Sequence, residues 1–153
     1  MSGLFTARAT LAALPFAVLF VAAWAAAAAQ EALVGFRSPS NNIHCQFHGN
    51  HEGSDDAAAA IRCDIMQISN RAPSRPRDCE LDWGQAFEIS RKAAAGARIC
   101  HGDTVMDDRL PALPYGKTWQ RHGLTCTSKQ GGVTCVNAKG HGFDLSRGAQ
   151  RVF

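Results

Sequence analysis

The stretch Gly123–Gly142, GLTCTSKQGGVTCVNAKGHG, decides the fold that we expect for this chain. Cys126 and Cys135 stand on either side of Lys129–Gly132, whose two glycines supply the positive φ that a tight hairpin turn needs. Leucine, threonine and valine residues, which favour strands, flank this turn on both sides. The stretch therefore predicts a β-hairpin with one cysteine on each arm.

The second arm of this hairpin echoes an earlier piece of the chain. Ser128–Cys135 reads SKQGGVTC, and Ser38–Cys45 reads SPSNNIHC. Both run from a serine through a turn-forming pair to a β-branched residue, one more residue and a cysteine. We interpret the pattern as a recurring way of leading into a strand, without taking it as an internal repeat.

Two further strands are predicted by a strict alternation of apolar and polar residues over Ile43–His48 and Ala60–Met66. We expect them to pair antiparallel around Gly53-Ser54, with Cys45 opposite Cys63. In this register the whole apolar set falls on one face of the pair, whereas a slip of one residue would place apolar residues opposite polar ones.

Six cysteines follow residue 29, and an even number after a secretory signal indicates disulfides. Their number alone allows 15 pairings. The strand register pairs Cys45 with Cys63, the short turn pairs Cys126 with Cys135, and elimination pairs Cys79 with Cys100. No CxxC or Cys/His zinc spacing occurs, so we expect no structural metal and no cofactor.

The rest of the chain also favours strands, and no long helical periodicity follows residue 29. A helix over Trp83–Ala95 is an alternative to a strand followed by a helical turn at Arg91–Ala95. Leu113–Gly116 has the composition of a type I turn. The expected fold is all-β: a small disulfide-stapled domain of short antiparallel strands and hairpins. The additional strands are predicted at Gln85–Ser90, Ala97–Cys100, Thr118–Arg121 and Gly140–Ser146.

Residues 1–29 have the pattern of a cleaved signal peptide, which leaves 30–153 as a single disulfide-containing β domain. Arg8 precedes the apolar run Leu11–Trp24, and small residues end at Ala29 before Gln30. A retained transmembrane anchor is the alternative, because the apolar run is long enough to span a bilayer. We expect a secreted or periplasmic protein without stable membrane insertion after cleavage.

The charge balance gives no indication of nucleic-acid binding. The formal net charge is +3 for the whole chain, which is too small to attract a polyanion by itself. Ser69–Asp78, SNRAPSRPRD, carries three arginines but no aromatic residue for base stacking. We interpret it as an irregular surface crossing, and we expect the partner to be an unknown envelope or extracellular component.

Five short motifs occur together in this chain: Phe36–Ser40 with Asn42, Ile43 and Cys45; Arg62-Cys63; Cys100 with Gly102–Thr104; Leu113–Gly116; and Gly132–Cys135 with Asn137 and Gly140–Phe143. Together they resemble an uncharacterised family of small secreted bacterial proteins, a domain of unknown function. The resemblance spans nearly all of the chain after residue 29 and implies a secreted domain stapled by cysteines. It carries over no activity, cofactor or catalytic residue. Asn41-Asn42 stands where the family pattern has glycine, and asparagine tolerates the positive φ of such a turn.

Histidines on the first predicted strand pair do not form a convincing metal site. His44 and His48 alternate with the apolar residues and are therefore expected on the solvent face, with Asp64 opposite His44. Imidazole and carboxylate groups together can bind zinc or copper. However, the two histidines lie four residues apart on one strand, about 13 Å between Cα atoms, which is too far to share one ion.

Two constellations remain as candidates for function. Trp83, Tyr115 and Trp119 are large amphipathic aromatics that form a binding patch if they gather on one surface, and otherwise fill the core. His101 and Asp103 can act as base and orienter for a serine nucleophile such as Ser128 or Ser146, but no GxSxG motif is present. We therefore expect a non-enzymatic binding or structural module, with a small cell-envelope hydrolase using His101 and Asp103 as the alternative.

Overall fold

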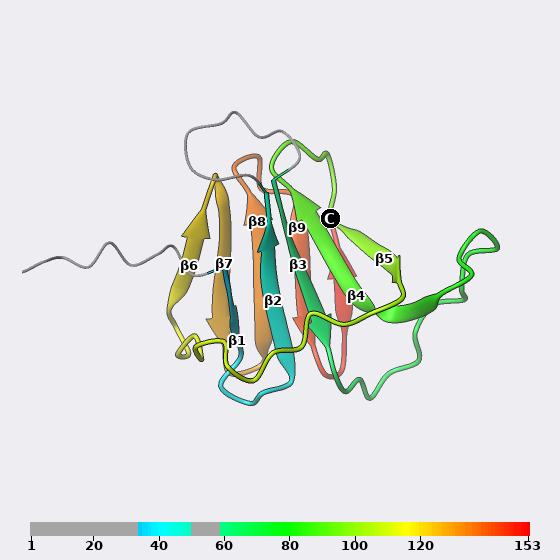
Figure 1. The fold of residues 1–153 in the computed structure, drawn as a ribbon, viewed down its shortest axis with the longest axis horizontal. Helices are drawn as coiled ribbons and strands as arrows, with labels where there is room; N and C mark the ends of the chain where they lie inside the picture. The colour runs from blue at the N-terminus through cyan, green and yellow to red at the C-terminus, as the bar shows by residue number, and fades with distance from the viewer. Residues whose placement is uncertain (1–33, 50–58) are drawn as a thin grey trace, which may run out of the picture.

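The computed structural model describes residues 34–49 and 59–153, which form two five-stranded antiparallel sheets packed face to face (Figure 1). The predicted signal peptide and the predicted turn at Gly53-Ser54 lie outside the described residues. The first sheet has the order β1-β2-β3-β4-β5, with bounds Gly35–Arg37, Ile43–His48, Ala60–Ile65, Asp82–Ser90 and Ala97–His101. The second has the order β6-β7-β8-β9-β10, with bounds Thr118–Arg121, Leu124–Lys129, Gly132–Asn137, Gly142–Ser146 and Gln150–Val152.

The all-β expectation is confirmed, since the described residues contain no helix. The helix considered over Trp83–Ala95 is replaced by β4 and a turn at Arg91–Ala95. Phe87 and Ile89 are both buried in the core from β4, which pairs with β3 on one side and β5 on the other. These pairings and the burial outweigh the helical preference of the alanines and lysine that follow.

The predicted register of the first cystine-bearing hairpin is confirmed. Ile43 lies opposite Ile65, Cys45 opposite Cys63, and Phe47 opposite Ile61, and all of these side chains are buried. All three predicted disulfides are present. Cys45 and Cys63 are 4.0 Å apart at Cα, close to the spacing of the nearest-approach pairs in an antiparallel ladder.

The hairpin Gly123–Gly142 forms as predicted, with Cys126 opposite Cys135 across β7 and β8. Its turn differs in detail from the prediction. Of the two adjacent glycines, only Gly132 has a positive φ, of 153°. A side chain at Gly132 would also collide with the carbonyl of Leu145 on β9. This glycine is therefore required both by the turn and by the close approach of the next strand.

Each sheet carries one row of four residues that spans four neighbouring strands. In both rows an aromatic residue lies opposite a cysteine, the disulfide joins that cysteine to the next strand, and a second aromatic residue lies opposite the second cysteine. The two sheets are thus equivalent meanders, with β1–β5 matching β6–β10. The rows are Phe36, Cys45, Cys63, Phe87 and Trp119, Cys126, Cys135, Phe143.

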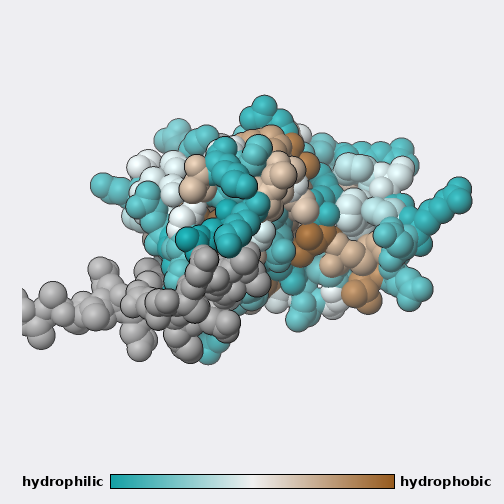
Figure 2. All heavy atoms as spheres, turned by 90° about the horizontal axis from the view of Figure 1, so that it is seen from above, coloured by the Kyte–Doolittle hydropathy of each residue, from teal (hydrophilic) through white to brown (hydrophobic). Residues whose placement is uncertain are grey.

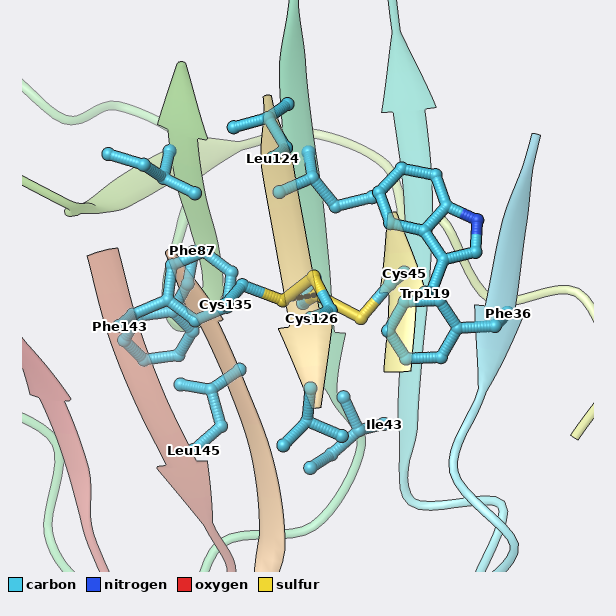
Figure 3. Close-up of a cluster of buried hydrophobic side chains, with 14 of the residues drawn as sticks. Phe36, Ile43, Cys45, Phe87, Trp119, Leu124, Cys126, Cys135, Phe143 and Leu145 are labelled. Atoms are coloured by element: carbon cyan, nitrogen blue, oxygen red, sulfur yellow. Dashed lines mark hydrogen bonds between the residues drawn. A yellow bond between two sulfur atoms is a disulfide. The ribbon is translucent and has the colours of Figure 1, made fainter. Parts of the chain in front are cut away.

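The two rows pack directly against each other at the centre of the sandwich (Figure 3). Equivalent residues meet across the interface, and the sulfur atoms of Cys63 and Cys135 are 3.8 Å apart. Tilted aromatic pairs close both ends of the contact, with ring centroids 5.9 and 6.1 Å apart, within the range of favourable aromatic pairing. The aromatic pairs are Phe36–Trp119 and Phe87–Phe143.

The sequence echo does not coincide with this structural equivalence. Ser38–Cys45 leads into β2 and Ser128–Cys135 leads into β8, whereas the equivalent of β2 is β7. The interpretation as a way of leading into a strand therefore holds. The two segments nevertheless come to the same end of the sandwich, as the cleft described below shows.

The expectation that His44 and Asp64 face solvent is wrong, although they do lie opposite each other. Both are buried under residues 102–113, which we call the strap. The strap crosses the outer face of the first sheet and bonds to β1, where Arg37 N–H donates to the Pro111 carbonyl and Leu113 N–H donates to the Arg37 carbonyl (Figure 1).

Polar side chains on the outer face of β2 and β3 satisfy the strap's backbone. Asp64 accepts the Val105 N–H at 3.0 Å, and Gln46 donates to the Val105 carbonyl at 3.1 Å. His44 Nδ1 accepts the Asp107 N–H at 3.3 Å. The alternation of polar residues on these strands therefore provides partners for an irregular segment, which otherwise would bury unpaired backbone groups.

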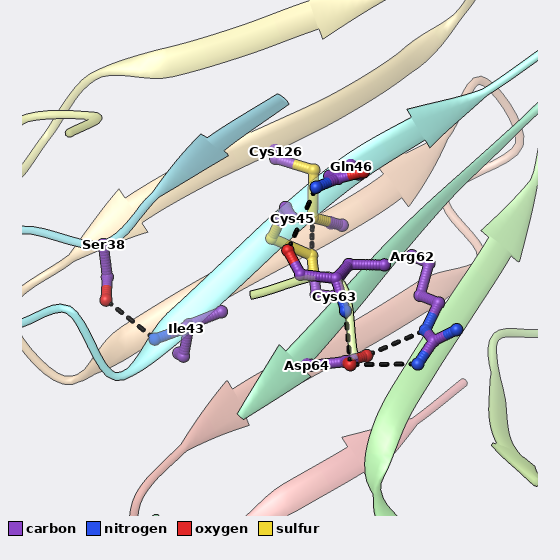
Figure 4. The surroundings of a disulfide bond; sticks show 10 residues. Ser38, Ile43, Cys45, Gln46, Arg62, Cys63, Asp64 and Cys126 are labelled. Carbon is purple, nitrogen blue, oxygen red and sulfur yellow. Dashed lines mark hydrogen bonds and ion pairs between the residues drawn. A yellow bond between two sulfur atoms is a disulfide. The ribbon is translucent and has the colours of Figure 1, made fainter. Parts of the chain in front are cut away.

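The buried carboxylate of Asp64 is neutralised by Arg62, which donates to both of its oxygens at 2.9 Å (Figure 4). Burial acts to lower the pKa of the Arg62 guanidinium, but its bonds to Asp64 and Asp103 outweigh that effect and raise the pKa. This bidentate pair fixes the outer face on which the strap lies.

The turn before β6 spans Pro114–Lys117, one residue later than the predicted Leu113–Gly116, and it is of type II and not of type I. Lys117 N–H donates to the Pro114 carbonyl at 3.0 Å, and Gly116 has φ 79°. A positive φ at the third position defines type II and explains the glycine there.

Candidate functional site

A cleft of ≈ 330 Å³ opens at the end of the sandwich where the β1–β2 turn approaches the β7–β8 turn. We call it the end cleft. Its walls come from both sheets, and the two serine-led segments singled out by the sequence echo contribute most of them. The lining residues are Ser38, Ser40, Asn41, Asn42, Ile43, Met66, Gln67, Lys129, Gln130, Gly131, Gly132 and Arg147.

The first wall is a turn held by its own side chains. The Ser38 hydroxyl accepts the N–H group of Asn42 at 3.2 Å. It also accepts the N–H group of Ile43 at 3.0 Å (Figure 4). Asn41 takes φ 57°, which confirms that asparagine replaces the expected glycine there. Asn42 forms two hydrogen bonds with the backbone of Gln67, just after β3, at 3.1 and 2.9 Å. This wall is therefore preformed and does not depend on a ligand.

The second wall carries the positive charge of the cleft. Lys129 ends β7, with its ammonium group 2.8 Å from the Thr134 hydroxyl and 4.0 Å from an Asp144 oxygen. Arg147 follows β9 and is exposed, and its carbonyl is bonded by Ser69. No carboxylate occurs among the described residues that line the cleft.

The chemistry of the end cleft suits a small hydrophilic ligand with a negative charge. Its two cations provide the attraction, and hydroxyl, amide and backbone groups provide hydrogen bonds. A volume of ≈ 330 Å³ lies at the lower limit for ligand sites in proteins. The size therefore matches a single sugar ring or a comparable small molecule.

The structure does not bring the three aromatic candidates together. Trp119 is only 7% exposed and packs between Phe36 and Phe47 in the core. Tyr115 is 44% exposed in the turn before β6. Trp83 lies near the start of β4 on the other sheet, where its indole N–H donates to the Pro73 carbonyl at 3.1 Å. Trp119 is the partner of Phe36 in the central rows, which is why it cannot lie on a surface patch.

His101 and Asp103 do not meet through their side chains. The His101 ring bonds the backbone carbonyl of Asp103 through Nδ1 at 3.0 Å, and the Asp103 carboxylate is exposed beside Arg62. Of the serines considered as nucleophiles, Ser128 is buried in β7 of the other sheet. Ser146 uses its hydroxyl within the β9–β10 turn. The geometry of a nucleophile, a base and an orienting carboxylate is not assembled by these residues.

A comparison with protein-family models matches residues 15–153 to a family of unknown function (DUF6636). The chain belongs to the DUF6636 family. No curated protein and no solved structure matches the chain.

For this DUF6636 chain the described structure adds a disulfide-stapled β-sandwich to a family of unknown function. Three disulfides are typical of proteins from oxidising compartments. Among the described residues there is no helix long and apolar enough to cross a membrane. The end cleft was not predicted from the sequence, and the echo between Ser38–Cys45 and Ser128–Cys135 was its only visible signal.

Proposed function

We propose that this chain is a secreted or periplasmic, non-enzymatic binding module that holds a small anionic, hydroxyl-bearing ligand in the end cleft. The observation that carries the proposal is the composition of the cleft: two cationic side chains, a hydrogen-bonding turn, and no carboxylate among its described lining residues. Phosphorylated sugars and sugar acids have this combination of charge and hydroxyl groups.

The rigidity of the first wall supports binding without rearrangement. The bonds of Ser38 and of Asn42 with Gln67 fix the turn before a ligand arrives, so little conformational entropy is lost on binding. Lys129 and Arg147 are exposed, and they attract an anion without the cost of desolvating a buried charge.

The test is a panel of matched neutral and anionic sugars, observed by saturation-transfer NMR on the oxidised protein. Glucose, glucuronate and glucose 6-phosphate differ in charge while keeping the same ring. The anionic members should bind and glucose should not. The double variant K129Q/R147Q should weaken binding about tenfold, since each exposed charge contributes up to about 1 kcal/mol.

Lys139→Gln is the matched control, because Lys139 is an exposed cation on the β8–β9 turn outside the cleft. It should leave binding unchanged. The proposal fails if no anionic sugar of the panel binds, if glucose binds equally well, or if K139Q weakens binding as much as K129Q/R147Q.

A further inference from the structure

The three disulfides differ sharply in their access to solvent. Both cysteines of the Cys45–Cys63 and Cys126–Cys135 bonds are 0% exposed, since they form the centre of the core. In the third disulfide, Cys79 is 6% exposed but Cys100 is exposed at the end of β5. A thiolate must reach a sulfur atom to exchange with it. Only this third bond is thus open to attack in the folded protein.

An open cavity adjoins this disulfide. A concavity of ≈ 260 Å³ is lined by both of its cysteines together with Pro76, Asp78, Trp83 and Arg98. Arg98 also packs its guanidinium over the Phe87 ring, 4.6 Å from the centroid, and burial lowers its pKa. The cavity gives a reducing agent an approach to the sulfur atoms.

We infer that Cys79–Cys100 is a thiol-exchange site, a redox-controlled tether that a dithiol reductant opens while the sandwich stays folded. A thiolate of the reductant attacks Cys100 Sγ, the bond to Cys79 breaks, and Cys79 Sγ leaves with the electron pair and takes up a proton. The second thiol of the reductant then attacks the reductant's first sulfur in the mixed disulfide. Cys100 Sγ leaves with the electron pair and takes up a proton. Two electrons and two protons pass to the protein, and the reductant becomes a disulfide.

The Cys79–Cys100 bond restrains residues 66–81, the segment that connects β3 to β4 and protrudes at the right of Figure 1. Its three arginines, Arg71, Arg75 and Arg77, are exposed. Hydrophilic side chains project at the same end of the molecule in Figure 2. The beginning of the segment is bonded to the sandwich through Met66, Gln67, Ser69 and Asn70. From Arg71 onward, the described segment is tied by the Trp83–Pro73 hydrogen bond and the disulfide. Reduction therefore leaves a basic segment that is only weakly held.

This bond lies outside the packed core of the sandwich. The pairing of β4 with β3 covers Ala86–Ser90, and Cys79 and Cys100 are outside the core cluster that joins the two sheets. Opening the tether should accordingly free the arginine segment and leave the core packing around Trp119 intact.

The first test is graded reduction of the oxidised protein with dithiothreitol, followed by alkylation with iodoacetamide and peptide mass mapping. Cys79 and Cys100 should be alkylated at least tenfold faster than the other four cysteines. Equal rates for all six, or earlier labelling of any core cysteine, would overturn the inference.

The second test is limited trypsin digestion before and after reduction. Cleavage after Arg71 and Arg77 should become at least tenfold faster on reduction, and the C79S/C100S variant should be cleaved as fast without any reductant. Cleavage after Lys129, in the β7–β8 hairpin, should stay slow and serves as the internal control. The inference is overturned if C79S/C100S resists trypsin like the oxidised parent, or if it loses the near-ultraviolet circular dichroism of a packed core.

Discussion

Removing the central Cys126–Cys135 disulfide should destabilise the domain more than removing the peripheral Cys79–Cys100 disulfide, although the peripheral bond closes the longer loop. Cys126 and Cys135 are separated by 9 residues, and Cys79 and Cys100 by 21. Loop-closure entropy alone gives about 2.6 kcal/mol for the first bond and about 3.3 kcal/mol for the second. On that ground the peripheral bond would contribute more.

Burial reverses the order. Both sulfur atoms of Cys126–Cys135 are fully buried against the equivalent cystine of the other sheet. Replacing both cysteines with alanine removes two buried groups at about 1 kcal/mol each and leaves a cavity between the sheets. The total for C126A/C135A is about 5 kcal/mol, against about 3.3 kcal/mol for C79A/C100A, whose second cysteine is exposed.

The assay is urea denaturation of the oxidised proteins, followed by tryptophan fluorescence. Both variants should also show a larger dependence of the unfolding free energy on urea, because the unfolded chain expands when a cross-link is removed. If C79A/C100A proved to be as destabilised as C126A/C135A, the packing of the two central rows would not be the dominant contribution that the structure indicates.

Three further predictions concern the strap, the hairpin and one surface pair. Asp64→Ala should lower the unfolding free energy by about 3–5 kcal/mol, because the Arg62 guanidinium and the Val105 N–H both lose their buried acceptor. Faster hydrogen exchange at the Val105 amide would locate the effect in the strap. An exchange rate at Val105 equal to the parent's would contradict this prediction. Gly132→Ala should destabilise the β8–β9 pairing, since its new methyl group meets the Leu145 carbonyl, whereas Gly131→Ala, with open space around it, is the control and should be tolerated in the same urea assay. Hydrogen bonds from Arg109 hold the pKa of Asp107 below its ordinary value, so this pair stabilises the folded protein above the unfolded pKa of about 3.8 and stops doing so as the pH falls through the lowered pKa. The difference in melting temperature between the parent and D107N should therefore vanish as the pH falls from about 3.8 through the lowered pKa. A difference that grew on acidification would refute the assignment.

Two of the three disulfides could be predicted from the local sequence pattern, because strands with one buried face have a strict period of two, and the third followed by elimination. The alternation around Cys45 and Cys63 leaves one register in which the apolar residues agree, and β2 and β3 adopt it. The short turn between Cys126 and Cys135 acts in the same way on a local scale. Each of these two pairings depends on the residues next to its cysteines along the strands, and the alternation of apolar and polar residues shows which residues those are.

The environment of the polar face could not be predicted in this way. Alternation separates two faces but does not say what covers each one, and the strap over His44 and Asp64 has no periodicity of its own. Its position follows from hydrogen bonds between distant backbone groups and side chains, such as those of Val105. The same limit applies to Trp119, whose burial depends on the packing of two sheets.

The end cleft shows both sides of this contrast. The sequence echo indicated that Ser38–Cys45 and Ser128–Cys135 lead into strands in a similar manner, and each does. Their meeting at one end of the sandwich depends on how the two meanders stack, which the central rows determine. Lys129 and Arg147 therefore could not be predicted as site residues from the sequence.

The assignment of the end cleft as the ligand site is tested most directly by mapping amide chemical shifts. The oxidised protein, labelled with ¹⁵N, is titrated with glucose 6-phosphate and glucuronate. Binding in the cleft should concentrate the shifts at Asn42, Gln67 and Gly131, which line it from both sheets, with little change at Trp83 or His101. Saturating shifts around Trp83 or His101 with none at the cleft, or no shifts with either compound, would contradict the assignment.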